Sequence, residues 1–312
     1  MNKTVGILVM AYGTPQSLDH VEAYYTHIRR GRKPTPELLR DLIDRYKAIG
    51  GVSPLNEITR MQSQGLETLL NANANNNRTY RVYLGMKHCS PFIQDAIEDM
   101  HRDGIEEAVG FVLAPHYSVM SIGTYIQAAE EALQKSDGLH MTFIRSWHLH
   151  PDYLQAAARR IQDSLEKFPK QVQKDIRVVF SAHSLPEKIL SMGDPYPRQI
   201  HETGDALARE LKLNHWLYAW QSAGRTADPW LGPDILDVLK SLRKEGHTSV
   251  ISCPIGFVSD HLEVLYDIDI ECQALCKEIG IHLIRTASLN ADPDFLKALA
   301  NIVVEHLAGE SA

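Results

Sequence analysis

The segment IRVVFSAHSLPE at residues 176–187 decides the predicted fold. Val178 to Ala182 form a run of apolar or small residues without alternation, which is typical of a strand buried on both faces of a parallel sheet. Pro186 cannot continue a central strand, so the strand should end near His183. Ligands bind outside the carboxyl ends of the strands in open α/β sheets, which places His183 where a ligand would bind. A loop histidine bonded to neighbouring backbone is the alternative at this point.

A similar pattern occurs at the start of the chain. The apolar residues 5–11 run into a turn, and AYGTP at 11–15 parallels AHSLP at 182–186. Two amphipathic segments, each closed by a glycine, lead to apolar strands at 108–113 and 250–253, as in βαβ units. The repetition predicts an α/β fold of two similar halves, each a four-stranded parallel sheet. Tyr12 from one half and His183 from the other would line a cleft between them.

Composition limits the class of protein. A length of 312 residues suffices for two domains, and a net charge of -7 argues against a general nucleic-acid binder. No apolar run approaches the ~18 residues of a spanning helix, so we expect no stable membrane insertion. Four cysteines do not make a disulfide framework in a chain of this length, which favours the cytoplasm.

An insertion follows the first strand, before the strand predicted at 81–85. Segments 18–28 and 37–49 have helical apolar spacing, and HIRRGRK at 27–33 lies between them. Such a cluster of cations is ordinarily a solvated patch. In an acidic chain it could instead bind anions, because the planar fork of arginine suits carboxylates.

The second informative segment is GFVSDHLEVLYD at 256–267. Ser259 or Asp260 is a good N-cap, so a helix is predicted to begin there. Because it follows the strand predicted at 250–253, the helix should start at the same sheet edge as His183.

Glu263, Asp267 and Glu271 are spaced by four and would share one face of this helix. Like charges at that spacing repel, and an exposed acidic face is the ordinary interpretation. Glu263, however, is expected within a turn of His183. A histidine and a carboxylate that converge could bind a divalent metal or act as an acid/base pair.

Eight motifs are then recognisable together: LVMAYGTP (8–15), YYTHIRRGRKP (24–34), GGVSPL (50–55), VLAPHYS (112–118), SAHSLPEK (181–188), GDPYP (193–197), WQSAGRTADPWLGP (220–233) and GFVSDHLEVLYDID (256–269). On these motifs the chain resembles the ferrochelatases along nearly its whole length, above all the short soluble coproporphyrin ferrochelatases of Gram-positive bacteria. The resemblance implies a chelatase fold of two Rossmann-like domains. It also implies insertion of Fe2+ into a porphyrin, coproporphyrin III in that class, during haem biosynthesis and without an organic cofactor.

The resemblance also implies roles for single residues. His183 and Glu263 fall on the family's invariant histidine and glutamate, and Tyr12 falls on a tyrosine that can contact iron from the other face of the ring. Positions that contact the tetrapyrrole and its propionates correspond to Arg29, Arg45, Tyr46, Ser53 and Tyr125.

The chemistry of the reaction fits these roles. A porphyrin must be bent and must lose two pyrrole protons before a metal ion can bind its nitrogens. His183 would be a base with a pKa near neutrality, and Glu263 would receive protons or hold Fe2+. Asp267 and Glu271 offer only oxygen ligands, so we expect an outer site there for Mg2+ or for Fe2+ on its way inward.

The predicted domains are 1–118, with a porphyrin-binding insertion at about 16–78, and 119–312, whose last helix could pack back on the first half. The chain lacks the cysteine-bearing extension of the animal-type pattern, so no [2Fe–2S] cluster is expected. The expected partners are the porphyrin and Fe2+, with a monomer that makes transient contacts with neighbouring haem-pathway enzymes.

Two alternatives stay open on the sequence. One is a ferrochelatase that uses protoporphyrin IX. The other is a non-catalytic carrier of haem or metal, with Tyr12 or His183 as axial ligand. Glu263 argues against the carrier, because a carrier needs one axial ligand and no opposing carboxylate.

Overall fold

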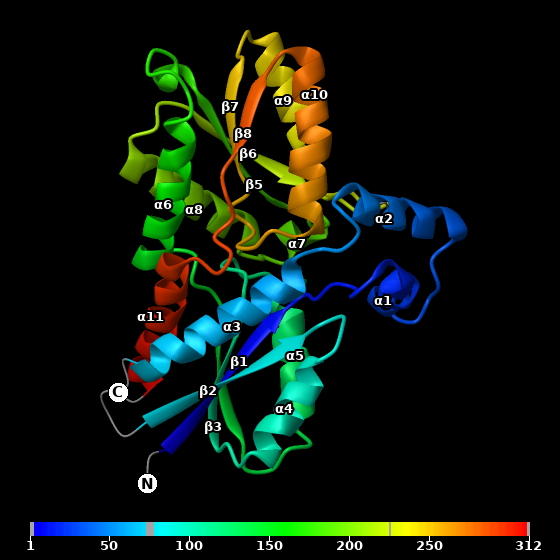
Figure 1. The fold of residues 1–312 in the computed structure, drawn as a ribbon, viewed down its shortest axis with the longest axis vertical. Helices are drawn as coiled ribbons and strands as arrows, with labels where there is room; N and C mark the ends of the chain where they lie inside the picture. Colours follow the sequence, from blue (N-terminus) through cyan, green and yellow to red (C-terminus); the bar gives the residue numbers. More distant parts are fainter. Residues whose placement is uncertain (1–2, 73–77, 225, 311–312) are drawn as a thin grey trace.

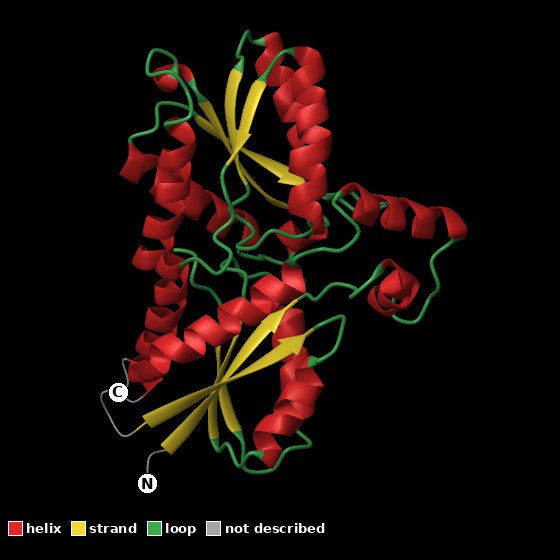
Figure 2. Ribbon diagram, viewed as in Figure 1, coloured by secondary structure: helices red, strands yellow, loops and turns green. Residues whose placement is uncertain are grey.

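The computed structural model describes residues 3–72, 78–224 and 226–310, and these residues form two four-stranded parallel sheets (Figures 1 and 2). The strand order is β2-β1-β3-β4 in one sheet and β6-β5-β7-β8 in the other, so both sheets follow the same order in their own half. The predicted repeat of two parallel sheets is confirmed. The strands are β1 (Lys3–Ala11), β2 (Arg78–Met86), β3 (Glu107–Val112), β4 (His140–Ile144), β5 (Arg177–His183), β6 (Trp216–Gln221), β7 (Ser249–Cys253) and β8 (His282–Arg285).

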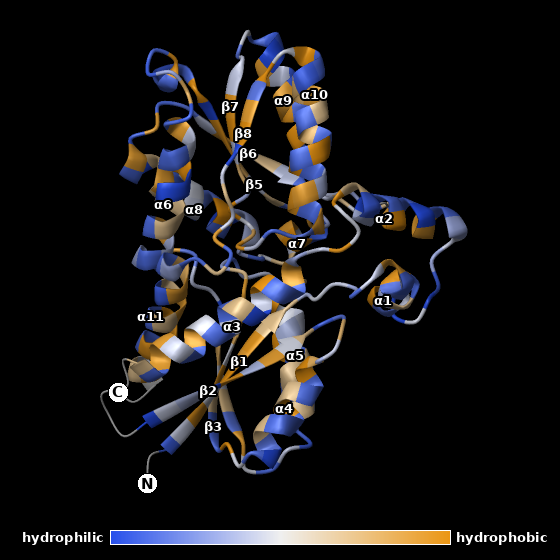
Figure 3. Cartoon of the chain, viewed as in Figure 1, coloured by the Kyte–Doolittle hydropathy of each residue, from blue (hydrophilic) through white to orange (hydrophobic). Residues whose placement is uncertain are grey.

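Helices cover both faces of each sheet, and most of them show hydrophilic and hydrophobic sides (Figure 3). The α-helices are α1 (Val21–Ile28), α2 (Pro36–Ala48), α3 (Leu55–Ala72), α4 (Ile93–Arg102), α5 (Ile122–Leu133), α6 (Pro151–Leu165), α7 (Lys188–Ser191), α8 (Tyr196–Leu211), α9 (Ile235–Lys244), α10 (Gln273–Ile279) and α11 (Pro293–Glu310). Short 3-10 helices η1 (Leu18–His20) and η2 (Gln173–Asp175) and the π-helix η3 (Val264–Cys272) complete the described chain. None of the helices in these ranges is long and apolar enough to cross a membrane.

The central strand β1 is buried on both faces, as its unbroken apolar run predicts. Val5, Ile7 and Val9 pack into one core with α3 and α11, while Leu8 and Met10 pack into another with α4 and α5. All five side chains are at most 1% exposed. A strand enclosed in this way can offer functional side chains only at its ends.

The predicted domain boundary at residue 118 is wrong. Strand β4 pairs with β3, with Phe111 opposite Ile144, so the first sheet continues well beyond that residue. The physical reason is the crossover through α5, which returns the chain to the same sheet as a βαβ unit does. The insertion between β1 and β2 contains α1, α2 and α3, and α1 and α2 lie to one side of both sheets (Figure 1).

The last helix packs back on the first half, as the sequence suggests. Phe295 and Val303 of α11 are fully buried in the same core as Val5 and Phe111. Helix α6 also joins the halves, because Tyr153 belongs to this core while later residues of α6 belong to the core of the second sheet.

The helix predicted to begin at Ser259 or Asp260 differs from the expectation. It begins at Leu262 and is π-helical over η3, where the backbone N–H of Gln273 donates to the carbonyl of Ile268. Ser259 and Asp260 do not act as caps because tertiary contacts engage their side chains. In a π-helix the bonding partner lies five residues away, so each turn holds between four and five residues and residues four apart still lie near one face. The charges of Glu263 and Glu271 both raise the pKa of Asp267, as neighbours on one face would.

Candidate active site

His183 is the last residue of β5, at the carboxyl edge of the second sheet, as predicted. Side chains alternate along a strand, so His183 points to the same face as Val179. Val179 is packed against Ile268 and Cys272 of η3. The imidazole is therefore directed toward the helix that begins at Leu262 and carries Glu263.

A glycine brings the loop that carries Glu263 onto β5. The backbone N–H of Gly256 donates to the carbonyl of Ser181 over 3.1 Å. A Cβ atom at Gly256 would lie 2.6 Å from the Cβ of Ala182, closer than packed atoms allow. Only glycine lets the loop lie this close to the strand that ends in His183.

His183 and Glu263 form an ion pair. Nε2 of the histidine lies 3.5 Å from Oε1 of the glutamate, and each side chain is about one third exposed (32% and 35%). Burial alone would lower the pKa of His183, but the charge and hydrogen bond of Glu263 outweigh it and raise the pKa to about 9. Burial opposes ionisation of Glu263 in the same way, yet the histidine holds the pKa of that carboxyl below its usual range. The sequence led us to expect that His183 would have a pKa near neutrality. With a pKa of about 9, it is instead an imidazolium at pH 7.

Two further residues fix this pair. Nε2 of His261 lies 3.7 Å from the second oxygen of Glu263, and its Nδ1 faces the carbonyl of Ser259 at 3.0 Å. The buried Tyr196 donates its hydroxyl to the carbonyl of His183 over 3.0 Å. Each carboxylate oxygen of Glu263 therefore faces one histidine. The hydrogen bond from Tyr196 on α8 fixes the backbone of His183.

Tyr12 faces the pair from the first half. It follows β1, its side chain is 41% exposed, and its ring lies 4.5 Å from the ring of His88. Burial and then the charge of Glu263 raise the pKa of Tyr12. That the two strand ends contribute to one site stays a prediction.

Tyr125 and Lys87 form another wall from the first half. Tyr125 on α5 is 5% exposed, and Nζ of Lys87 lies 4.6 Å from the centre of its ring and 2.5 Å from Oγ1 of Thr124. Burial, followed by the nearby charge of Arg30, lowers the pKa of Lys87 to about 8. The ammonium group of Lys87 therefore lies over the ring of a buried tyrosine.

The hydroxyls of Tyr46 and Ser53 are engaged within the protein. Tyr46 is 2% exposed and its hydroxyl lies 3.0 Å from Oγ1 of Thr14, next to the turn that follows Tyr12. Oγ of Ser53 accepts the backbone N–H of Leu55 over 3.3 Å, at the start of α3. Their contact with a tetrapyrrole stays a prediction.

The two predicted arginines lie in different surroundings. Arg29 lies near the ring of Tyr25 and donates from Nε to the carbonyl of Arg32 over 3.3 Å. Arg45 is directed to the second half, where Nη1 lies 3.6 Å from Oδ1 of Asp267. The structure therefore places Arg29 in the cationic segment and Arg45 beside the acidic helix.

Asp267 is buried and already has partners. The hydroxyl of Ser222 donates to Oδ2, and Arg45 lies on the other oxygen. Burial raises the pKa of Asp267 to about 6, with further increases from Glu263 and Glu271 and opposing effects from Ser222 and Arg45. Nowhere in residues 3–72, 78–224 and 226–310 do three His, Cys, Asp or Glu side chains gather closely enough to hold a metal ion. The outer site at Asp267 and Glu271 stays a prediction.

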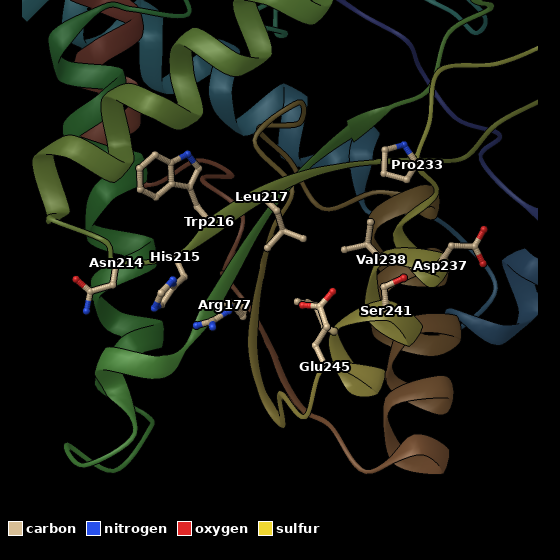
Figure 4. A pocket seen from close by; sticks show the side chains of 11 residues that line it. Arg177, Asn214, His215, Trp216, Leu217, Pro233, Asp237, Val238, Ser241 and Glu245 are labelled. Carbon is tan, nitrogen blue, oxygen red and sulfur yellow. The ribbon is translucent and has the colours of Figure 1, made fainter.

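A groove of about 560 Å³ lies elsewhere, along β6 and α9 (Figure 4). Arg177, Trp216 and Glu245 are among the side chains that line it, and it contains none of the predicted site residues. The candidate active site is therefore defined by the convergence of the two strand ends.

Comparison with known proteins identifies the family. A model of the ferrochelatase family matches residues 4–307. The coproporphyrin III ferrochelatase of Anoxybacillus flavithermus is 47% identical over 309 residues, which cover 99% of this chain and 98% of that protein. The chain belongs to the ferrochelatase family. The coproporphyrin III ferrochelatase of Geobacillus kaustophilus is 48% identical over 311 residues, with 99% and 98% coverage.

The fold of this ferrochelatase is also found in a solved structure. SirB from Bacillus subtilis, solved with Fe3+, has a TM-score of 0.62 and 13% sequence identity, and the match covers 99% of this chain and 97% of that one. At this identity the likeness concerns the fold alone. It confirms the two-sheet chelatase architecture.

Sequence reasoning missed three residues at the site of this ferrochelatase: His261, Tyr196 and Lys87. His261 stands two positions before Glu263 in one motif, and Tyr196 stands in GDPYP. Lys87 directly follows β2, so the argument that located His183 at a strand end would have found it too.

Proposed function

We propose that this ferrochelatase inserts Fe2+ into coproporphyrin III and releases Fe-coproporphyrin III for haem biosynthesis. The observation that carries the proposal is the His183–Glu263 ion pair at one strand end, faced by Tyr12 from the other. The names of relatives at 47% and 48% identity support the choice of porphyrin. Iron is the substrate, and no organic cofactor enters the reaction.

The pair supports both the binding of metal and the removal of protons. Insertion replaces two pyrrole protons by one Fe2+, so two protons must leave. Glu263 is ionised and can receive the cation, whereas His183 must first lose its own proton. Arrival of Fe2+ at Glu263 neutralises the charge that raises the pKa of His183, so the imidazole becomes neutral. It can then accept the pyrrole protons in turn and pass each to solvent.

The first half would hold the ring. Bending a porphyrin needs binding energy from parts of the ligand that do not react. Arg29, Arg30 and Lys87 offer positive charge for propionates, and the exposed ring of Tyr12 offers aromatic surface. Contact of the porphyrin with the buried Tyr125 would require Lys87 to move aside. Coproporphyrin III has four propionates and protoporphyrin IX has two, so a site with several cations favours the former.

The proposal also covers an outer metal site, the cellular compartment and the partners of the enzyme. Asp267 and Glu271 would form a weak outer site for Mg2+ or for incoming Fe2+, in competition with Arg45. The enzyme would act in the cytoplasm, in keeping with four free cysteines, as a monomer without a [2Fe–2S] cluster. It would exchange substrate and product through transient contacts with neighbouring haem-pathway enzymes.

One assay tests the function. Purified protein receives Fe2+ under anaerobic conditions with either coproporphyrin III or protoporphyrin IX, and absorbance follows insertion. We expect a higher kcat/KM for coproporphyrin III. A preference for protoporphyrin IX would favour that alternative, and tight porphyrin binding without insertion would favour a carrier.

A further inference from the structure

Arg285, at the end of β8, spans the segment that carries Glu263. Its Nε and Nη2 donate to the two oxygens of Asp269 over 2.7 and 2.9 Å. Its Nη1 lies 3.2 Å from Oδ1 of Asp260. Asp260 precedes Glu263 in the loop and Asp269 follows it in η3, so one guanidinium bridges the chain on both sides of the glutamate.

The loop side of this bridge is fixed by further contacts. Oγ of Ser288 donates to Oδ1 of Asp260 over 2.8 Å, and Nδ2 of Asn290 donates to Oδ2 over 2.9 Å. The backbone N–H of Asp260 donates in turn to Oδ1 of Asn290 over 2.8 Å. Arg285 itself is 14% exposed. Asp260 therefore cannot shift without breaking several hydrogen bonds in a partly buried network.

The contacts of Arg285 with Asp260 and Asp269 enclose the position of Glu263 in the chain. Glu263 stands at the junction of the loop and η3, and both of its oxygens depend on this position to meet His183 and His261. A π-helix is rare and is held by tertiary contacts rather than by local preference. We propose that Arg285 is a positioning residue that sets the place of Glu263 against His183, acting through Asp260 and Asp269.

Arginine is specifically suited to this task. Its planar fork reaches both oxygens of Asp269 and still contacts Asp260 through the remaining nitrogen. The single ammonium of lysine can keep the charge but cannot make these directed contacts at once. Charge alone would therefore not preserve the function.

Because the inference rests on the proposed function, its test has a readout besides turnover. Arg285→Lys is compared with Arg160→Lys, a matched control. Arg160 forms a similar, partly buried pair with Asp292 at 2.7 Å, on α6. Calorimetry with Zn2+ alone and kinetics with Fe2+ and coproporphyrin III are run on both variants and on the wild type, and thermal unfolding measures their stability.

We expect Arg285→Lys to lower kcat and Zn2+ affinity by about tenfold, the effect typical of groups that orient metal ligands. KM for the porphyrin should stay within about twofold, since the ring is held by the other half. The control should lose a similar amount of thermal stability and keep both activities. Asp269→Asn should reproduce part of the loss of kcat and Zn2+ affinity. This second variant still tests the inference if Arg285→Lys does not fold.

Unchanged kcat and Zn2+ affinity in Arg285→Lys would overturn the inference. So would losses that Arg160→Lys shares, because they would be general effects of stability. If the wild type inserts no iron, the proposed function fails, and the Zn2+ comparison still decides the role of Arg285.

Discussion

The carboxyl ends of β1 and β5 occupy the same place in two sheets with the same strand order, yet they carry different chemistry. At the end of β1 stands Tyr12, with the aromatic and cationic side chains of Tyr125 and Lys87 near it. At the end of β5 stands His183, paired with the carboxylate of Glu263. Under the proposed function, one strand end would bind a flat anionic ligand and the other would bind the metal ion and accept protons.

The difference teaches how one repeated unit can serve two purposes. In a buried strand, the core restricts which residues are tolerated everywhere except at the ends. The two halves can therefore share a core pattern and differ in a few residues at their strand ends. The proposed function then divides between the two halves: the second half would handle the metal and the protons, and the first half would bind the porphyrin. Changes in the second half should affect kcat or the metal, and changes in the first should affect the porphyrin.

The largest expected effect tests the second half. His183→Ala removes the group that accepts pyrrole protons, so turnover should fall on the order of 10³-fold. Porphyrin binding, measured by fluorescence quenching, should be largely kept. His101→Ala, on the exposed surface of α4, is the control. Substantial turnover by folded His183→Ala protein would remove the assigned role of the histidine.

A smaller loss with a change in pH dependence is expected for Glu263→Gln. Only neutral His183 accepts a proton, and Glu263 raises the pKa of His183 to about 9, so wild-type kcat/KM should rise with pH toward that value. The amide carries no charge, so the pKa falls and the rise moves to lower pH. At its plateau kcat should still be about 10²-fold below that of the wild type. Initial rates across this pH range measure both effects, and an unshifted profile would contradict the pairing.

Arg29→Ala tests the first half. Loss of a charged hydrogen bond costs about 1.5–3 kcal/mol, which should appear as a higher KM for coproporphyrin III with kcat little changed. Arg45→Ala is a further test of this division, because Arg45 of the first half forms an ion pair with Asp267 of the second half. That variant should also change the dependence on Fe2+. The separation by half would be lost if Arg29→Ala changed KM for Fe2+ instead.

The smallest effect is expected at the outer acidic site. Asp267→Ala or Glu271→Ala should raise KM for Fe2+ by about two- to fivefold, the size of a weak charge interaction, and leave KM for the porphyrin unchanged. Kinetics with Mg2+ absent and present measure this, with Glu278→Ala on the surface of α10 as control. Wild-type behaviour of both variants at limiting Fe2+ would leave these carboxylates without a role in the delivery of the metal.

The sequence predicted best what depends on short segments. Tyr12 and His183 were located because a buried strand and the proline that follows it are local signals. Strand β4 was missed, and with it the domain boundary, because HMTFI is short and only pairing with β3 identifies it. The start of the helix that carries Glu263 was misplaced because Ser259 and Asp260 form tertiary contacts instead of caps. Arg285 could not be predicted, since its partners meet it only in the fold.

The packing of α6 has a consequence for the porphyrin itself. This single helix contributes Tyr153 to the core of the first half and Ile161 to the core of the second, and both side chains are buried. Rotation of one half against the other would have to bend the helix or expose one of its ends to water. The position of one half relative to the other is therefore held by the packing of α6. Under the proposed function, the free enzyme and its complexes should superpose closely, and the energy of bending would be stored in the macrocycle rather than in the polypeptide.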